Sequence, residues 1–570
     1  DRFGAQPSDR PSPAASGDDA DDAFAFTPSE TLSKLQGTWK ADKIVRDGKD
    51  LPGFMLKTAR RVAERNEVSI SIGGMKIIHA LVRIDESQTP MHVASLSLFD
   101  LPAGYRRDFF ASVKRELGRR LHLAPVLRRR LAAMPLQLAD PVWVEDDAVD
   151  LDHHVQRVTL PAPGTMRQFE DCAAALHAEL LDRHRPLWRL HVIDGLASGQ
   201  VGYYFKAHHA ALDGLAGVQL ARTLFDTTPR PSPTRPPRSA AAAAAEHPGP
   251  IELGAAALRH DGAQYIKLLR HLPEVVRTLG GLFGAPASAG AGRLRQNFVF
   301  GPRTPLNVPI TAERGFAGLS LPLEALQSIA AAHDAKLNDI VLALCSGALR
   351  RYLVQHGGIP PRPLTAAMPI SLRETGDTEY TTQATMPLVN LQTHIADPLR
   401  RLRAIRDAAG AVKSMVQQAR GIVPMDFPSI GVPWVLHGLA ELYGRSQVTS
   451  VMPPLANVVV SNIPGPRVPL YAAGARMQCY WPMSIVEHGL GLNITVMSYA
   501  GSMGFGFTTA RAAVPDAEAL TRALAAAFDE LVARPVPRRP RKAAAAATTV
   551  TTAAEPAAPS RSHRARRSRA

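Results

Sequence analysis

The fold of this chain is decided by a stretch that joins two adjacent histidines to an Asp-Gly pair, His208-His209-Ala210-Ala211-Leu212-Asp213-Gly214. The preceding residues, 201–207, are rich in aromatic side chains and indicate a strand. Because successive side chains of a strand point to opposite faces, His209 shares a face with Tyr203 and Phe205, whereas His208 lies on the other face. The two histidines therefore cannot perform the same task.

Residues 215–225 place apolar side chains at helical spacing directly after this stretch. Asp213 stands at the start of the predicted helix, where a carboxylate accepts hydrogen bonds from the free amides of the first turn. An unperturbed imidazole titrates near neutral pH, so a histidine at a strand end beside such a helix is suited to act as a general base. These residues alone leave open which histidine does so.

Length and composition limit the classes of protein to consider. A chain of 570 residues is too long for one core, so we expect two or three domains. With 45% apolar and 21% charged residues, the composition is that of a globular protein. Cys172, Cys345 and Cys479 are widely spaced, form no metal-binding motif and favour a reducing, cytoplasmic compartment. No apolar run approaches the ~20 residues of a membrane-spanning helix, and we expect no bound metal.

The formal charge of +15 is concentrated at the carboxyl end of the chain. Residues 534–570 hold ten basic residues and one acidic residue, which accounts for +9 of the total. Basic clusters of this kind bind anionic membranes or nucleic acid, or merely keep a tail soluble. Because no aromatic residues or nucleic-acid motifs accompany them, we expect a membrane surface rather than nucleic acid as partner.

Changes in composition divide the chain into six predicted ranges. Residues 1–32 and 535–570 have the composition of disordered segments, and the Pro- and Ala-rich residues 229–250 that of a linker. Between them lie two α/β domains, predicted over residues 90–228 and 251–534. Residues 33–88 resemble the small lipocalin-like β domains that open with a Gly-Thr-Trp strand, here Gly37-Thr38-Trp39, and we interpret them as an accessory β module.

Coarse patterns place the remaining elements. In the first domain we expect strands at residues 91–99 and 186–193 and helices at 107–121 and 169–183. In the second we expect helices at 323–333, 338–356 and 516–534, and strands at 316–321, 364–370, 390–393, 458–461, 491–499 and 504–509. A second histidine pair, His153-His154, lacks the downstream Asp-Gly and is interpreted as structural. An apolar stripe over residues 265–282 is typical either of packing between domains or of a membrane-surface helix. Residues 422–439, apolar but broken by prolines, are interpreted as a lid or a membrane-facing patch.

Five motifs in a fixed order resemble those of the bacterial wax ester synthase/acyl-CoA:diacylglycerol acyltransferases. They are Pro186-Leu187-Trp188, His208 to Gly214, Asn338-Asp339, Ser461-Asn462-Ile463-Pro464-Gly465-Pro466, and Gly491-Leu492-Asn493-Ile494-Thr495-Val496. The histidine motif by itself also marks chloramphenicol acetyltransferases and peptide-synthetase condensation domains. The full set, spread between residues 90 and 533, indicates the lipid-acylating branch.

This resemblance implies a fold and a reaction. The fold is a pseudo-dimer of two chloramphenicol-acetyltransferase-like α/β domains around a central tunnel. The reaction is direct transfer of a long-chain acyl group from acyl-CoA to diacylglycerol or a fatty alcohol, which makes triacylglycerol or wax ester. Acyl-CoA is then a co-substrate, no cofactor is required, and the water-insoluble acceptor is reached at a membrane or lipid-droplet surface.

The resemblance also implies roles for residues. His209 would be the general base and His208 a supporting residue, while Asp213 would hold the loop through an ion pair and Gly214 would leave space for the substrate channel. Asn338 and Asp339 match a pair that the family needs near the active site, although a helix-capping role explains their placement equally well. The other motif residues are expected to line the tunnel or to be structural: Pro186, Leu187, Trp188, Asn462, Pro464, Gly465 and Asn493.

Two other functions remain as alternatives. One is a CoA- or carrier-dependent acyl or condensation transferase that acts on a polar acceptor. The other is an inert scaffold that binds lipid surfaces through the basic tail and the amphipathic stripe. The joint presence of His209, Asp213 and the Asn338-Asp339 pair favours an enzyme, because an inert scaffold has no chemical need for them.

Overall fold

The computed structural model describes residues 90–132, 142–146, 148–212, 214–231, 301–371, 384–419 and 454–534, together with the backbone of six short strands between residues 37 and 81. Several predictions fall outside these residues: the disordered ends, Asp213, most of the linker, the apolar stripe and the proline-broken apolar segment. The six strands are β1 (Gly37–Lys40), β2 (Val45–Arg46), β3 (Lys49–Asp50), β4 (Arg60–Glu64), β5 (Glu67–Ile72) and β6 (Met75–Leu81). The lipocalin-like interpretation of this region stays a prediction.

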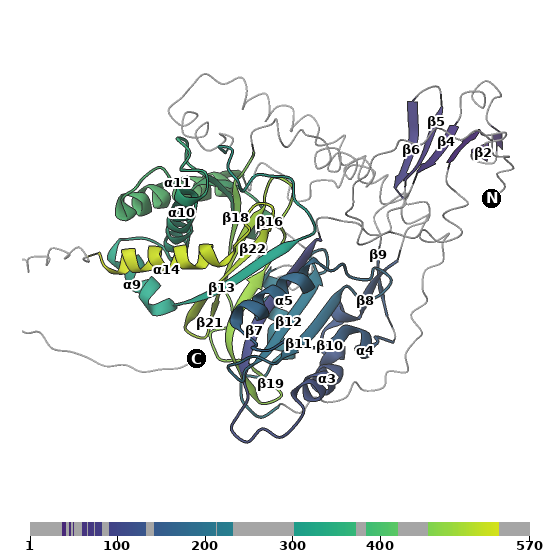
Figure 1. Ribbon diagram of the computed structural model, residues 1–570, viewed down its shortest axis with the longest axis horizontal. Coiled ribbons are helices and arrows are strands. Elements are labelled where there is room, and N and C mark those ends of the chain that lie inside the picture. The colour runs from purple at the N-terminus through teal and green to yellow at the C-terminus, as the bar shows by residue number, and fades with distance from the viewer. Residues whose placement is uncertain are drawn as a thin grey trace, which may run out of the picture.

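The first half of the protein is built on a six-stranded mixed sheet with the order β10-β11-β12-β7-β20-β19 (Figure 1). Strands β11 and β12 form an antiparallel hairpin, and β12 then pairs with β7 so that His208 lies opposite His92. The strands are β7 (His92–Asp100), β10 (Val155–Thr159), β11 (Trp188–Asp194), β12 (Val201–His208), β19 (Tyr471–Ala472) and β20 (Ala475–Met483).

The second half repeats this architecture with the order β13-β22-β21-β18-β14-β17. Its carboxyl-terminal hairpin joins β21 to β22, close to the two strands predicted there, and β18 runs parallel to both β21 and β14. The strands are β13 (Arg314–Pro322), β14 (Thr365–Ala367), β17 (Leu388–Asn390), β18 (Val458–Ile463), β21 (Leu492–Tyr499) and β22 (Ser502–Ala510). Short two-stranded pairings join β8 (Arg129–Ala132) to β9 (Val142–Glu145) and β15 (Ile370–Ser371) to β16 (Ala384–Thr385). The predicted α/β class with two similar halves is confirmed.

One strand of the second half completes the sheet of the first. Strand β20 pairs antiparallel with β7 over residues 476–483, although it lies within the predicted second domain. Its backbone packs directly on β22, where a Cβ atom added to Gly506 would lie 1.8 Å from the carbonyl oxygen of Pro482 and one on Gly504 2.4 Å from that of Tyr480. Only glycine permits this approach, which places the two sheets against each other.

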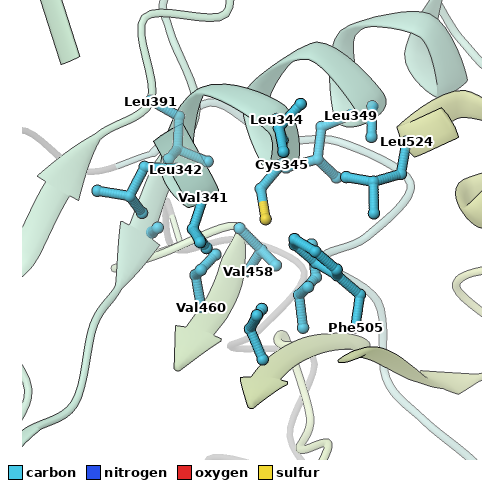
Figure 2. Close-up of a cluster of buried hydrophobic side chains, with 14 of the residues drawn as sticks. Val341, Leu342, Leu344, Cys345, Leu349, Leu391, Val458, Val460, Phe505 and Leu524 are labelled. Atoms are coloured by element: carbon cyan, nitrogen blue, oxygen red, sulfur yellow. The ribbon is translucent and has the colours of Figure 1, made fainter. Parts of the chain in front are cut away.

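Helices cover the sheets and supply the second half with its core. Figure 1 shows α9, α10, α11 and α14 gathered on one side of the second sheet. In Figure 2, Leu344 and Cys345 of α10 meet Phe505 of β22 and Leu524 of α14, all of them 0% exposed. Burial of each such side chain contributes about 1.5–3 kcal/mol. The helices are α3 (Phe109–Arg120), α4 (Leu151–His154), α5 (Met166–Ala178), α6 (Gly214–Leu224), α9 (Leu323–Ala332), α10 (Leu337–Gln355), α11 (Pro398–Ala419) and α14 (Glu518–Val532), with 3₁₀ turns at Leu121–Leu123 and Pro125–Arg128.

Helix α5 lies where the two halves meet and joins them through charged contacts. Arg511 of the second half donates to Asp171 at 2.9 Å, and Arg167 donates to Asp516 at 3.1 Å. Beneath these pairs the Glu170 carboxylate accepts a hydrogen bond from the Gly318 amide at 2.8 Å. The interface is therefore ionic at its surface and hydrogen-bonded below it.

Three predicted boundaries are wrong for identifiable physical reasons. The helix predicted over residues 169–183 ends at Ala178, because the buried Lys206 ammonium binds the carbonyl oxygens of Leu176 and Glu179 at 2.5 and 2.6 Å. The strand predicted over residues 390–393 ends at Asn390, whose side chain accepts from the amide of Gln392 and forms a turn. The strand predicted over residues 364–370 breaks at Pro369, which has no N–H for the ladder.

Candidate active site

A cavity of about 660 Å³ lies between the two halves, and both contribute to its walls. Side chains of β12 and α6 form one wall, and strands β18, β20 and β21 form the other. Most of the lining is apolar, with a small number of polar groups, which is typical of a ligand pocket. The sequence motifs converge on this cavity from distant parts of the chain.

His209 lines the cavity immediately beyond the end of β12. Its backbone amide donates to the carbonyl oxygen of Met91 at 2.7 Å, which continues the ladder with β7 by one residue. Tyr203 and Phe205 line the same cavity, as the alternation of side chains predicts. The backbone of His209 is therefore fixed by the sheet, and its side chain lies on the wall of a largely apolar chamber.

His208 lies on the opposite face and shapes the turn. Its Nδ1 atom accepts a hydrogen bond from the Ala210 amide at 3.2 Å, and its own amide donates to the carbonyl oxygen of Leu187. Burial, followed by the nearby charges of Arg183 and His209, lowers the pKa of His208 to about 4. His208 is thus held neutral and occupied with the backbone, which fits the predicted supporting role.

The face of β12 that carries His208 is packed with other buried polar groups. Lys206 is 0% exposed, and burial lowers the pKa of its ammonium to about 8. His92 and His177 lie beside it, and burial is the largest cause that lowers their pKa values, to about 2 and about 3. His177 Nδ1 lies 2.9 Å from the Tyr204 hydroxyl. This neutral histidine cluster supports the strand from behind the cavity.

The Pro186-Leu187-Trp188 motif supports the histidine motif without reaching the cavity. Trp188 is 1% exposed, and its Nε1 donates to the carbonyl oxygen of Leu127 at 2.9 Å. His154 stacks on the indole at 4.4 Å between ring centroids and its Nδ1 lies 2.8 Å from the carbonyl oxygen of Trp188. Among the described residues the cavity lining includes none of the three motif residues, so we interpret them as structural. The interpretation of His153-His154 as structural agrees with this packing.

Asn338 and Asp339 occupy the first turn of α10 and perform different tasks. The Asp339 carboxylate accepts from the Lys336 amide at 2.8 Å and so caps the helix. Asn338 accepts at Oδ1 a 3.3 Å hydrogen bond from the side-chain amide of Asn462, which lines the cavity. Asn338 therefore holds Asn462, a residue of the cavity wall. Asp339 instead stabilises the helix that carries Asn338.

The Ser461 to Pro466 motif meets the amino end of α6. A Cβ atom on Gly214 would lie 2.5 Å from Cδ1 of Ile463, so glycine allows α6 and β18 to approach here. Ser461, Asn462, Ile463, Pro464 and Gly214 all line the cavity. Gly465 allows a second close approach, since its Cβ atom would lie 2.1 Å from the carbonyl oxygen of Ser498.

Asn493 lines the cavity and links two segments of its wall through side-chain hydrogen bonds. Its side-chain amide donates to the carbonyl oxygen of Ile485 at 2.9 Å, and its Oδ1 accepts from the Thr495 hydroxyl at 2.8 Å. The segment that follows β20 is thereby tied to β21. Asn493 is both a lining and a positioning residue.

Sequence reasoning missed the contribution of β20 and the segment after it. Tyr480, Pro482, Ser484 and Glu487 all line the cavity. A usable signal was present, because the buried Ala475, Met477 and Cys479 alternate with exposed residues as in a strand. Cysteine chemistry is not called for, since none of the three cysteines belongs to the described lining.

Comparisons with known proteins agree with this geometry. The pattern of the wax ester synthase/diacylglycerol acyltransferase catalytic domain matches residues 77–341, and that of the carboxyl-terminal domain of the same family matches residues 382–532. A putative diacylglycerol O-acyltransferase of Mycobacterium tuberculosis is 36% identical over 469 residues, which cover 80% of this chain and 99% of that protein. The chain belongs to the wax ester synthase/diacylglycerol acyltransferase family.

Other members of this family support the assignment. A probable diacylglycerol O-acyltransferase of Mycobacterium tuberculosis is 33% identical over 79% of this chain and 96% of its own length. The solved structure of the wax ester synthase/diacylglycerol acyltransferase from Marinobacter aquaeolei VT8 covers 79% of this chain and 95% of its own, with 29% identity and a TM-score of 0.55. The predicted family and enzyme class are confirmed: the protein is an acyltransferase. In the described part of the chain, every helix is too short or too polar to cross a membrane.

Proposed function

We propose that this protein transfers a long-chain acyl group from acyl-CoA to the hydroxyl group of a lipid alcohol, diacylglycerol or a fatty alcohol, with His209 as general base. The observation that carries the proposal is the position of His209 on the wall of a mostly apolar cavity between the two halves. The names of the family and of its mycobacterial members support the substrate class.

The reaction follows from the groups at the cavity wall. His209 takes the proton of the acceptor hydroxyl as its oxygen attacks the thioester carbonyl. The tetrahedral intermediate expels the CoA thiolate, and the imidazolium returns the proton to the sulfur. Because a thiolate is a good leaving group, no covalent enzyme intermediate, cofactor or metal is required, and positioning with base catalysis supplies most of the rate enhancement.

We also propose that the acceptor reaches the cavity from a membrane or lipid-droplet surface to which the protein binds peripherally. Met91 and Met386, both part of the cavity lining, are 41% and 52% exposed, which gives the cavity an apolar rim. An apolar rim suits a substrate that is insoluble in water.

The test is product analysis with labelled palmitoyl-CoA and both acceptors present, diacylglycerol and hexadecanol. We expect labelled triacylglycerol or wax ester on thin-layer chromatography, and equimolar release of CoA. Neither product should form with His209→Ala. A wild-type protein that releases CoA only with polar acceptors would contradict the lipid substrate class. A His209→Ala protein with near-normal CoA release would contradict the assignment of the base.

A further inference from the structure

Glu487 is an acidic residue on the wall of the reaction cavity that the proposed mechanism does not use. Its side chain is exposed, and the protein around it nevertheless desolvates its carboxyl group enough to raise the pKa. Within the described part of the chain, no cation or hydrogen-bond donor offsets that burial. A carboxyl group so placed keeps its hydrogen-bonding capacity for a ligand.

The segment that carries Glu487 is held in place from three sides. Asn493 binds the carbonyl oxygen of Ile485 at 2.9 Å. Glu487 and Leu490 exchange backbone hydrogen bonds of 3.2 and 2.9 Å, and Nδ1 of His488 accepts from the Ile310 amide at 3.1 Å. The carboxyl group is therefore presented on a fixed turn, as a recognition group must be if little is to be lost on binding.

Sheet topology places this turn at the same edge as His209. Strands β12 and β20 both pair antiparallel with β7, so they run in the same direction and end at the same edge of the sheet. Since β7 lies between them, their ends are roughly 10 Å apart, two strand spacings. An acceptor whose hydroxyl group meets His209 can therefore extend along this edge towards Glu487, which follows the end of β20.

The walls around the two residues differ in character. The wall beneath α6 is apolar, with Leu212, Leu220, Leu224 and Phe225, and suits hydrocarbon chains. The wall that carries Glu487 also has the polar side chains of Ser484, Asn493 and Thr495. Asn493 and Thr495 hydrogen-bond each other, so Glu487 is the ionisable group of this wall, and its carboxyl group has no hydrogen bond or ion pair to the described part of the chain.

We infer that Glu487 determines acceptor selection, because its carboxyl group hydrogen-bonds a polar group of the acceptor other than the reacting hydroxyl. The ester groups of a glycerolipid only accept hydrogen bonds, so the carboxyl group donates to an ester oxygen in its protonated form. A simple long-chain alcohol has only methylene groups beyond its hydroxyl and leaves the carboxyl group unpaired. Sites built around such a hydrogen bond discriminate strongly against the analogue that lacks it. This inference rests on the proposed function.

The experiment is a competition in one vessel between dioleoylglycerol and hexadecanol for labelled palmitoyl-CoA. It compares the wild type with Glu487→Leu, Glu487→Gln and, as a matched control, Glu324→Leu on the exposed start of α9. The ratio of triacylglycerol to wax ester is measured. This ratio does not depend on how much of each variant is folded.

We expect Glu487→Leu to lower the ratio of triacylglycerol to wax ester by about tenfold or more. Glu487→Gln should stay near the wild type, because the NH2 group of its amide still donates a hydrogen bond. Glu324→Leu should leave the ratio unchanged. An unchanged ratio in Glu487→Leu would overturn the inference. Equal loss of both products, with a raised KM for palmitoyl-CoA, would overturn it as well, because the carboxyl group would then serve the donor. A wild type that makes neither product would refute the proposed function itself.

Discussion

The two histidine pairs of this chain have the same sequence and opposite surroundings. His154 ends the short helix α4, is 1% exposed and stacks on Trp188. His209 follows β12 and lines the cavity, while its neighbour His208 faces the protein interior. One pair packs the first half of the molecule, and the other presents an imidazole to the reaction cavity.

The backbone accounts for this difference. Adjacent residues of a helix are turned by only about 100° from each other, whereas adjacent residues of a strand point to opposite faces. A histidine pair at a strand end therefore has one member for support and one for the cavity. On α4, Asp150 caps the helix through the amides of Asp152 and His153, and the pair is used for packing.

The largest effect in this comparison is expected from His209→Gln. Loss of the general base should lower kcat/KM for palmitoyl-CoA by about 10²–10⁴-fold, while the protein remains folded. CoA release measures the rate, and circular dichroism checks the fold. The matched control is His153→Gln in the other pair, which should retain most of the activity. Similar losses in both variants would remove the distinction between the pairs.

The reverse outcome is expected at His154. His154→Ala removes a buried ring and its hydrogen bond to the Trp188 carbonyl, and should lower the free energy of unfolding by about 3 kcal/mol. The folded fraction should keep a kcat near that of the wild type. Urea unfolding gives the first quantity, and activity normalised to folded protein gives the second. A stable His154→Ala protein with low kcat would make His154 part of the reaction.

A third test concerns Gly214, which follows the His208-His209 pair. A Cβ atom added at Gly214 would already lie 2.5 Å from Cδ1 of Ile463. Gly214→Val adds two methyl groups beyond that Cβ and should narrow the cavity. We expect kcat/KM to fall by roughly ten- to a hundredfold, about 2 kcal/mol, since small misplacements are costly in catalysis. The double variant Gly214→Val/Ile463→Ala should recover most of the loss. Failure to recover would mean that Gly214 is needed for another reason.

Local patterns predicted those parts of the site that lie within one segment of chain. The alternation before His208 predicted β12 and the face of His209. Helix α10 begins one residue before the predicted capping pair, because Asp339 caps it through the Lys336 amide. In these places sequence neighbours are also spatial neighbours.

Parts of the site that depend on distant contacts could not be predicted in this way. Strand β20 joins β7 across almost 400 residues of sequence, and Pro482 interrupts its pattern. Without β20, nothing in the sequence shows that Glu487 and His209 share a sheet edge. Likewise the end of α5 is set by Lys206, whose partners lie 27 and 30 residues away.

The smallest effect expected is a pH dependence that the two pairs share. Burial is the largest cause that lowers the pKa values of His154 and His208 from 6.5 to about 4 in the folded protein. As pH falls from 6.5 towards 4, the unfolded chain takes up these protons before the folded protein does, so the free energy of unfolding decreases. Each histidine changes the free energy of unfolding by up to about 1.4 kcal/mol per pH unit, which corresponds to the uptake of one proton.

His154→Phe, which keeps an aromatic ring against Trp188, should reduce this pH dependence by up to that amount relative to the wild type. Urea unfolding between pH 4.5 and 6 measures it. His208→Phe should do the same, because the pKa of His208 in the folded protein is lowered as far as that of His154. An equal slope in wild type and both variants would show that neither ring is held neutral, and the support assigned to His208 would then need another physical basis.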